Sequence, residues 1–347
     1  MGNSPSELVL QITLLRVFIL AGLGFFVAIL ATPFWINFLY KYKFWKQAKE
    51  ETIYGTKATV FQQLHAEKHK RNIPTMAGVL FWVIVLALSL KFNLTRSQTY
   101  LPLFALVSVG IIGAVDDWFN IRGIGRIKGI RARQKMAWLL VMAGLGAWWF
   151  YEKLGQHSIH LPGIGDFLVG WWYIPIFIII ILATANAFNI TDGLDGLSGG
   201  LFVIAYGAYG ILALANNQVS LAIFCATVVG VLLAYLWFNI YPARFFGGDT
   251  YSLAFGATLG VVAMLINRGT GVAVLPLIAF VPLLETLSVI IQLTYRKLYK
   301  KKLFLVAPIH HHFEAIGWPE TKVTMRFWVI GAVFATMGLV IGLVGAG

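Results

Sequence analysis

The sequence has almost no cysteine and few charged residues. Cys225 is the only cysteine among 347 residues and lies inside an apolar run, so it forms no internal disulfide and behaves as a small core hydrophobe. Only 12% of the residues are charged and 59% are hydrophobic, whereas soluble chains average about 25% charged residues. A soluble core could not bury that much apolar surface. The composition therefore excludes a soluble globular domain and favours an integral membrane protein.

Acidic residues are scarcer than basic ones. The chain has 14 Asp and Glu against 27 Lys and Arg, a formal net charge of +13. Clustered Lys and Arg can form a phosphate-binding footprint for nucleic acid. In a membrane protein, the simpler explanation is that basic residues collect in cytoplasmic loops. We therefore predict the lipid bilayer as the environment and no nucleic-acid partner.

Long apolar runs are the most frequent feature of the chain. Ten runs have about the length of a membrane-spanning helix. They cover residues 12–39, 75–92, 98–115, 136–151, 168–188, 197–215, 219–240, 250–266, 271–293 and 326–346. We predict an all-α integral membrane protein with about ten transmembrane helices, organised as one polytopic membrane domain over residues 1–347. The N-terminal segment has no basic region and no cleavage site, so we expect the first span to be retained.

Basic residues alternate between the predicted loops. Most of the 27 fall after the first, third and ninth runs, and the positive-inside rule places those loops in the cytosol. Both termini are then outside. The loops predicted to be cytosolic are residues 41–74, 116–135, 189–196, 241–249 and 294–325.

The six aspartates are distributed unevenly. Five lie at predicted cytosolic ends of spans, and only Asp166 lies on the other side. The five are Asp116, Asp117, Asp192, Asp195 and Asp249. Carboxylates beside apolar helix ends cost desolvation free energy unless they bind something. Adjacent carboxylates also repel, unless cations lie nearby or the pair shares one proton, and Mg²⁺ shared with substrate phosphates is one such cation. Although Asp116 and Asp117 alone could merely cap a helix, five aspartates on one face favour an active site.

Two glycine-rich segments contain the later aspartates. In NITDGLDGLSGG, Asn189, Asp192 and Asp195 follow at steps of three and share a face if the backbone is helical there. The glycines let a ligand approach the backbone, although an ordinary loop also uses Asn, Asp and Gly. In ARFFGGDTYS, two glycines precede Asp249 at the start of the eighth run. This pattern is typical of an ordinary N-cap and also of a phosphate site at a helix N-terminus.

A histidine run and a buried acid complete the candidate residues. PIHHHFE, residues 308–314, offers three imidazoles after a basic stretch, which favours an anion or nucleotide contact over a zinc site, with a solvated loop as the alternative. Glu285 stands near the middle of the ninth run, three residues after Pro282. We predict a kinked helix whose buried acid is either functional or paired with a neighbouring polar group.

Together, and in this order, the motifs resemble those of the phospho-N-acetylmuramoyl-pentapeptide transferases, within the polyprenyl-phosphate N-acetylhexosamine-1-phosphate transferase superfamily. The resemblance runs from about Lys70 to Trp328 and rests on PTMAG, GAVDDW, KG with a later lysine, NITDGLDGL, FFGGDT and APIHHHFE. It implies ten helices in the bacterial cell (inner) membrane with a cytosolic active site. It also implies Mg²⁺-dependent transfer of phospho-MurNAc-pentapeptide from UDP-MurNAc-pentapeptide to undecaprenyl phosphate, giving lipid I and UMP for peptidoglycan synthesis.

The resemblance also implies a role for each matched residue. Asp249 would ligate Mg²⁺, Asp116 would position or deprotonate the lipid phosphate, and Asp117 would lie beside it. Lys70 and Lys135 would neutralise the phosphates. The nucleotide pocket would be lined by Lys70, Thr75, Asn189, Asp192, Asp195 and Phe246, the last stacking on uracil. The donor would also contact His310, His311 and His312.

The chain departs from the family pattern at a few positions. Asn120 stands where a lysine is common, Asn72 and Ile73 replace Gly-Thr, and Tyr251 replaces a small glycine. The nearest alternative function is that of a sister transferase using UDP-GlcNAc, but the unbroken histidine run favours the muramyl-pentapeptide donor. A secondary transporter would carry its acids near the midplane, and a noncatalytic scaffold would explain neither the acids nor the histidines. The sequence leaves open whether the chain forms a homodimer.

Overall fold

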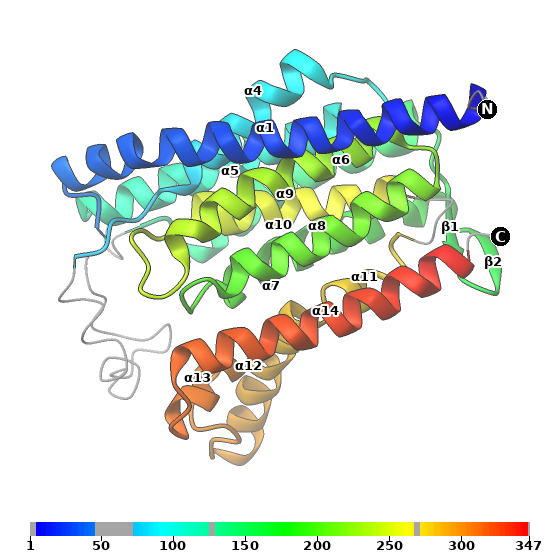
Figure 1. Ribbon diagram of the computed structural model, residues 1–347. Helices are drawn as coiled ribbons and strands as arrows, with labels where there is room; N and C mark the ends of the chain where they lie inside the picture. Colours follow the sequence, from blue (N-terminus) through cyan, green and yellow to red (C-terminus); the bar gives the residue numbers. More distant parts are fainter. Residues whose placement is uncertain (1–4, 46–71, 125–128, 267–270, 346–347) are drawn as a thin grey trace.

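The computed structural model describes residues 5–45, 72–124, 129–266 and 271–345 of the chain. Within these ranges the protein is almost entirely helical (Figure 1). The elements are α1 (Pro5–Lys41), α4 (Gly78–Phe92), α5 (Tyr100–Arg122), α6 (Ala132–Trp148), η1 (Trp149–Lys153), β1 (Ser158–Leu161), β2 (Gly165–Leu168), η2 (Gly170–Trp172), α7 (Tyr173–Thr191), α8 (Leu197–Ala215), α9 (Val219–Asn239), α10 (Asp249–Leu265), α11 (Leu275–Ile278), α12 (Phe280–Tyr299), α13 (Ile309–Ala315) and α14 (Glu320–Val344).

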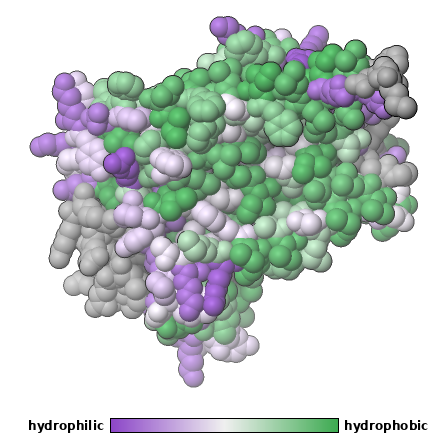
Figure 2. All heavy atoms as spheres, in the orientation of Figure 1, coloured by the Kyte–Doolittle hydropathy of each residue, from purple (hydrophilic) through white to green (hydrophobic). Residues whose placement is uncertain are grey.

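Six of the described helices are long and apolar enough to cross a membrane. They are α1, α5, α7 with the preceding 3₁₀ turn, α8, α9 and α14. Helices α4 and α10 are apolar but shorter. The surface carries a broad hydrophobic band, with hydrophilic side chains mainly toward its edges (Figure 2). The prediction of an all-α integral membrane protein is therefore confirmed, and the count of about ten spans stays a prediction.

Helix α10 forms the centre of the bundle, and nearly all of its side chains are buried. Its glycines permit the close packing. A Cβ at Gly256 or Gly260 would lie within 3 Å of α7 atoms at Thr184, and a Cβ at Gly113 of α5 would lie 2.5 Å from Thr250 of α10. Small residues at helix contacts are typical of membrane bundles, where lipid gives no hydrophobic drive for helices to associate. These contacts hold α5 and α7 closely against α10.

Two helix ends differ from the sequence prediction. The third apolar run ends at residue 115, but α5 continues through the aspartate pair to Arg122 and stops at Gly123, whose φ of 65° suits glycine. Asp116 and Asp117 therefore lie within a helix instead of closing it. Conversely, α7 ends at Thr191, so Asn189 is helical and Asp192 and Asp195 are not. The three residues do not share a helical face.

The ninth predicted span is not one helix. It is divided at Ala279 into the short α11 and the longer α12, which lies beside α7, α13 and α14 at the edge of the bundle (Figure 1). We predicted a kink at Pro282, but the helix is interrupted three residues earlier, at Ala279. Pro282 occupies the first turn of α12, where its missing N–H costs no helical hydrogen bond, and Pro276 does the same in α11. Each proline starts a helix here.

A β-hairpin that the sequence did not predict joins α6 to α7. Ser158 pairs with Leu168 and Leu161 with Gly165 in antiparallel register. The start of α1, the end of α14 and this hairpin lie at the same end of the molecule (Figure 1). His160 Nε2 lies 2.9 Å from the carbonyl oxygen of Gly345, which ties the hairpin to the end of α14. The connections from α7 to α8 and from α9 to α10 lie at the opposite end.

Candidate active site

An acidic cluster forms where α5, α6 and α10 meet. Lys135 Nζ donates to Asp116 Oδ2 at 2.7 Å and also to Asp249 Oδ2. The other oxygen of Asp116, Oδ1, accepts the Ile130 N–H at 2.6 Å. The three side chains are between one-tenth and one-fifth exposed, so the cluster opens to the surface without being fully solvated. Two carboxylates that share one ammonium are close enough to share another cation.

The electrostatics of the cluster are set by Lys135. It precedes the predicted fourth span and lies in the first turn of α6. Burial by itself would lower the pKa of Lys135, but the carboxylates of Asp249 and Asp116 outweigh burial and raise that pKa above its ordinary value. The lysine is therefore a fixed positive charge at neutral pH. Sequence reasoning placed it near the phosphates but did not identify its two carboxylate partners.

Asn189 completes the acidic cluster from the end of α7. Its Nδ2 donates to Asp249 Oδ1 at 3.3 Å and to Ser252 Oγ at 2.8 Å. Asp249 is the first residue of α10, as predicted, and follows Gly248 at φ 80°. Ser252 was not a candidate, although it ends the quoted motif ARFFGGDTYS. A serine one turn after an aspartate at a helix start is the signal that could have identified it.

Asp117 lies deeper than its neighbour Asp116. It is 1% exposed, and its Oδ2 accepts the Thr250 N–H of α10 at 3.1 Å. A Cβ at residue 248 would lie 2.2 Å from the same oxygen, so glycine is required there. The free N–H groups at the start of α10 were expected to attract a phosphate, and one of them binds Asp117. Asp117 therefore caps α10, which orients Asp249.

The PTMAG and FFGG segments pair through their backbones beside α10. Phe246 N–H donates to Pro74 O at 2.7 Å, Ala77 N–H to Phe246 O at 3.2 Å and Gly78 N–H to Gly247 O at 3.0 Å. The side chain of Phe246 is half-buried, whereas Thr75 is 1% exposed. The structure thus brings these two predicted nucleotide-pocket residues close together. Lys70, also predicted there, lies outside the described residues.

The loop after α7 holds Asp192 and Asp195 by different contacts. Asp192 Oδ1 accepts the Ser198 hydroxyl at 2.5 Å. Asp195 is 2% exposed, and its Oδ2 accepts the Ala243 N–H at 3.0 Å while its own N–H donates to Glu320 Oε1 at 2.6 Å. These bonds tie the loop to the segment before FFGGDT and to the start of α14. Glu320, the first residue of α14, was not among the sequence candidates, although it supports the loop.

The three histidines occupy unlike environments on α13. His310 is fully buried, and its Nδ1 lies 2.9 Å from Oε2 of the fully buried Glu285, so that acid has the polar neighbour that one of the two alternatives required. His311 Nδ1 lies 2.7 Å from Glu314 Oε2. His312 Nδ1 accepts the Leu305 N–H at 3.3 Å. A Cβ at residue 193 would lie 2.4 Å from His310 Nε2, so this histidine cluster abuts the loop after α7.

Two departures from the family pattern have local explanations. Tyr251 is fully buried and stacks on Tyr235 with ring centroids 4.3 Å apart, so its bulk fills the core and not the site. Asn72 has a φ of 48°, a conformation that glycine and asparagine adopt more readily than other residues. Asparagine can therefore stand where a glycine is common.

The residues of the acidic cluster fit a magnesium ion better than a metal that needs many protein ligands. Among the described residues, no three His, Cys, Asp or Glu side chains are grouped as a ligand set. Mg²⁺ uses only one or two carboxylates and shares its other positions with water and substrate phosphates. Asp249 and Asp116, which share the Lys135 ammonium, meet that requirement.

The acidic cluster belongs to a bundle of described helices of which six are long and apolar enough to cross a membrane, and the comparison with known families indicates the class of protein. The family model described as glycosyl transferase family 4 matches residues 99–267, which include α5, Lys135, Asn189 and Asp249.

Similar proteins cover nearly the whole chain. Each of the following is called phospho-N-acetylmuramoyl-pentapeptide-transferase. The chain is 35% identical over 325 residues to that of Geobacillus thermodenitrificans, covering 92% of this chain and 96% of the relative. It is 36% identical to that of Chloroflexus aurantiacus, covering 95% and 90%, and 38% identical to that of Bacillus anthracis, covering 93% and 97%. The chain therefore belongs to the phospho-N-acetylmuramoyl-pentapeptide-transferase family.

Proposed function

We propose that this protein transfers phospho-MurNAc-pentapeptide from UDP-MurNAc-pentapeptide to undecaprenyl phosphate, forming lipid I and releasing UMP. The observation that carries the proposal is the ammonium of Lys135 held between Asp116 and Asp249 at the start of α10. The family to which the chain belongs supports the identity of the donor.

The charge of the reactants explains the residues that surround them. A phosphate oxygen attacks a pyrophosphate, so catalysis rests on positioning and on neutralising negative charge. A Mg²⁺ ion at Asp249 would supply positive charge to the pyrophosphate oxygens. Lys135 provides a second, fixed positive charge, and Asn189 holds Asp249 in orientation. Asp116 is placed to position the acceptor phosphate or to take its proton.

The same proposal predicts the side of the membrane on which the site lies. The acidic and histidine clusters lie at the end of the molecule away from the chain termini and the hairpin. The basic loops at the cluster end then face the cytosol, where nucleotide-activated sugars are made, and the termini are outside the bacterial inner membrane. Undecaprenyl phosphate would reach the site from the bilayer.

A sister transferase using UDP-GlcNAc is the second candidate, because it shares the aspartate motifs. Purified protein is incubated with undecaprenyl phosphate, Mg²⁺ and either UDP-MurNAc-pentapeptide or UDP-GlcNAc, and UMP release is measured. We expect release with the muramyl donor and little with UDP-GlcNAc. Equal or reversed rates would move the protein to the sister branch, and no release with either donor would refute the transferase assignment.

A further inference from the structure

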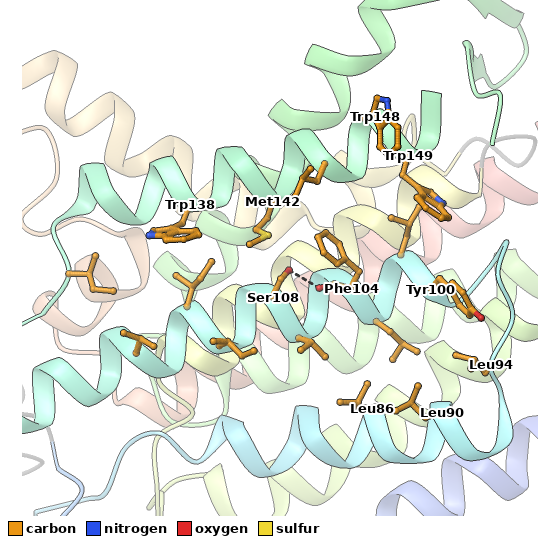
Figure 3. Close-up of a pocket in the computed structure, with 18 residues that line it drawn as sticks. Leu86, Leu90, Leu94, Tyr100, Phe104, Ser108, Trp138, Met142, Trp148 and Trp149 are labelled. Atoms are coloured by element: carbon orange, nitrogen blue, oxygen red, sulfur yellow. Dashed lines mark hydrogen bonds between the residues drawn. The ribbon is translucent and has the colours of Figure 1, made fainter. Parts of the chain in front are cut away.

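Helix α14 lies at the edge of the bundle, and its first two turns carry two basic side chains that the proposed chemistry does not use (Figure 1). Lys322 and Arg326 are four residues apart, so they share one side of the helix, and both are exposed. An apolar groove along α5, between α4 and α6, has by contrast no charged side chain in its lining (Figure 3). A charged ligand at the edge of the bilayer is therefore better matched by the start of α14.

The two basic side chains lie beside one aromatic ring. Arg326 Cζ is 4.3 Å from the ring centroid of Trp318, and Lys322 Nζ is 5.0 Å from it. The indole is held in turn by stacking on Phe313, with ring centroids 4.7 Å apart, and the Trp318 backbone N–H donates to the Phe313 carbonyl at 3.0 Å. A cation–π contact restrains a basic side chain without neutralising its charge. Both positive charges are therefore held at one place.

Neither of these charges is balanced by an acid. Among the described residues, no carboxylate forms an ion pair with Lys322 or Arg326. The acids closest in sequence have other contacts, because Glu320 Oε1 accepts the Asp195 N–H and Glu314 Oε2 lies 2.7 Å from His311 Nδ1. The pair can therefore receive an anion from outside the chain.

The length of α14 places the pair at the depth of phospholipid headgroups. The helix has 25 residues, or about 37 Å at the rise of an α-helix, whereas the hydrocarbon core of a bilayer is about 30 Å thick. Its first turns therefore extend beyond the core. Exposed apolar side chains begin one turn after Arg326 on the same side of the helix, at Val329, Val333 and Met337. This order of charged and apolar side chains complements an amphiphile with an anionic head.

The opposite side of the same turns supports the loop after α7. Residues two apart on a helix differ by about 200° in direction, so Glu320, Thr324 and Trp328 point away from the basic pair. Glu320 accepts the Asp195 N–H at 2.6 Å, and the Thr324 hydroxyl donates to the Asp195 carbonyl at 3.4 Å. Trp328 Nε1 donates to the Leu197 carbonyl at 3.3 Å. A ligand that restrains the start of α14 would thus also restrain this loop.

We infer that Lys322 and Arg326, held on Trp318, bind the anionic headgroup of a phospholipid in the cytosolic leaflet, with its acyl chain along Val329 and Val333. Anionic lipids of that leaflet attract basic side chains at the membrane surface. The ligand is a lipid and not a free anion, because the exposed apolar side chains begin directly beside the two charges. The site does not depend on the transferase reaction, and it gives the bilayer a contact with the helix that supports the loop after α7.

The test measures which lipid lies beside α14. A fluorescent label is attached to Val329→Cys, because Val329 is 64% exposed and the native Cys225 is fully buried. The labelled full-length protein is placed in bilayers that mix phosphatidylcholine with phosphatidylglycerol. One lipid at a time carries brominated acyl chains, which quench the label on contact. The ratio of the two quenching efficiencies gives the affinity of the anionic lipid relative to the zwitterionic lipid at this position.

We expect phosphatidylglycerol to be preferred, and Lys322→Gln combined with Arg326→Gln to reduce the preference by about tenfold, equivalent to roughly 1.4 kcal/mol. The matched control is Lys91→Gln combined with Arg96→Gln, which removes two exposed charges that lie over two different aromatic rings. It should leave the preference unchanged. Arg326→Lys keeps the charge and should also retain the preference.

Three results would overturn the inference. The first is equal quenching by the two lipids in protein that keeps both basic side chains, a comparison that also decides the matter if the double variant fails to fold in a thermal unfolding check. The second is a preference that survives the loss of both charges. The third is a preference abolished by millimolar inorganic phosphate, which would assign the site to a free anion. Since turnover is not measured, a negative transferase assay would refute only the proposed function.

Discussion

At the start of α10, the position of each charge depends on the contacts of a few single side chains. Asp249 is reached by Lys135 from α6 and by Asn189 from α7, whereas Asp117 is used to cap the helix. The two neighbouring aspartates of α5 therefore differ in role. Asp116 takes part in the open cluster, and the buried Asp117 holds the helix that presents Asp249.

We predict that Asp249→Asn lowers turnover by about a hundredfold to a thousandfold, as when an electrostatic contact to the transition state is lost. Asparagine keeps the size but removes the charge that binds a hard cation. The measurement is UMP release over a range of Mg²⁺ concentrations. Asp166→Asn on β2 is the matched control and should turn over normally. If Asp249→Asn kept near-normal turnover at limiting Mg²⁺, the metal ligand would be reassigned, first to Asp116.

At the scale of elements, close backbone contacts join the loops to the helices. The loop after α7 passes so near α13 that residue 193 has no room for a side chain beside His310. We predict that Gly193→Ala lowers the free energy of unfolding by about 1–3 kcal/mol, the usual cost of overpacking. It should also reduce turnover, because His310 and Glu285 must move.

Gly207→Ala is the control for that change. Residue 207 lies within α8, and a Cβ there meets no atom within 4 Å. Alanine should leave the stability unchanged or raise it by up to about 1 kcal/mol. Thermal unfolding of the two variants in the same detergent measures both effects. Equal stability of Gly193→Ala and wild type would show that the histidine cluster does not abut this loop.

The hairpin and the end of α14 form a contact that depends on pH. The Gly345 carbonyl, and then the Asp166 carboxylate, raise the pKa of His160, because each accepts a hydrogen bond from one nitrogen of the protonated ring. A raised pKa in the folded state means that the contact contributes its full stability below about pH 6.5, the unfolded value. The contribution is lost as the pH rises through the folded pKa.

We therefore predict faster hydrogen exchange of the hairpin amides above neutral pH than below pH 6, after correction for the intrinsic pH dependence of exchange. His160→Gln removes the titrating group and should make the corrected protection of the hairpin independent of pH. Persistence of the pH effect in that variant would assign it to another group.

For the whole molecule, the arrangement of the helix ends predicts the topology. The predicted loops alone would suggest residues 120 and 310 as positions for cysteine labelling. Both residues are buried, with 6% and 0% of their surface exposed. Arg133 and Lys301 are exposed near the clusters, and Ile164 is 72% exposed in the hairpin. The native Cys225 is fully buried, so the background from the wild type should be low.

Cysteines placed at 133, 301 and 164 should separate the two sides of the membrane. In intact cells, an impermeant maleimide should label Ile164→Cys strongly and Arg133→Cys and Lys301→Cys weakly. Lysed cells should label all three. Strong labelling of Arg133→Cys in intact cells would contradict the cytosolic assignment of the acidic cluster.

The sequence by itself determined the class of the protein, the approximate place of most of the long helices and a set of candidate site residues. A bilayer requires about 20 apolar residues per spanning helix, and the length of an apolar run can be read directly from consecutive residues. The motif order was enough to indicate the family. Even the position of Asp249 at the start of a helix followed from the glycines and the apolar run beside it.

Only the tertiary structure decided which candidates meet. Lys135 joins Asp116 and Asp249 although 114 residues separate it from the latter, and Asp117 turns inward to cap α10. The break at Ala279, the pairing of Glu285 with His310 and the groove along α5 also appeared only there. These features depend on how closely helices distant in sequence approach each other. That approach is set by glycines such as Gly113 and Gly256 at the contacts, which local patterns do not reveal.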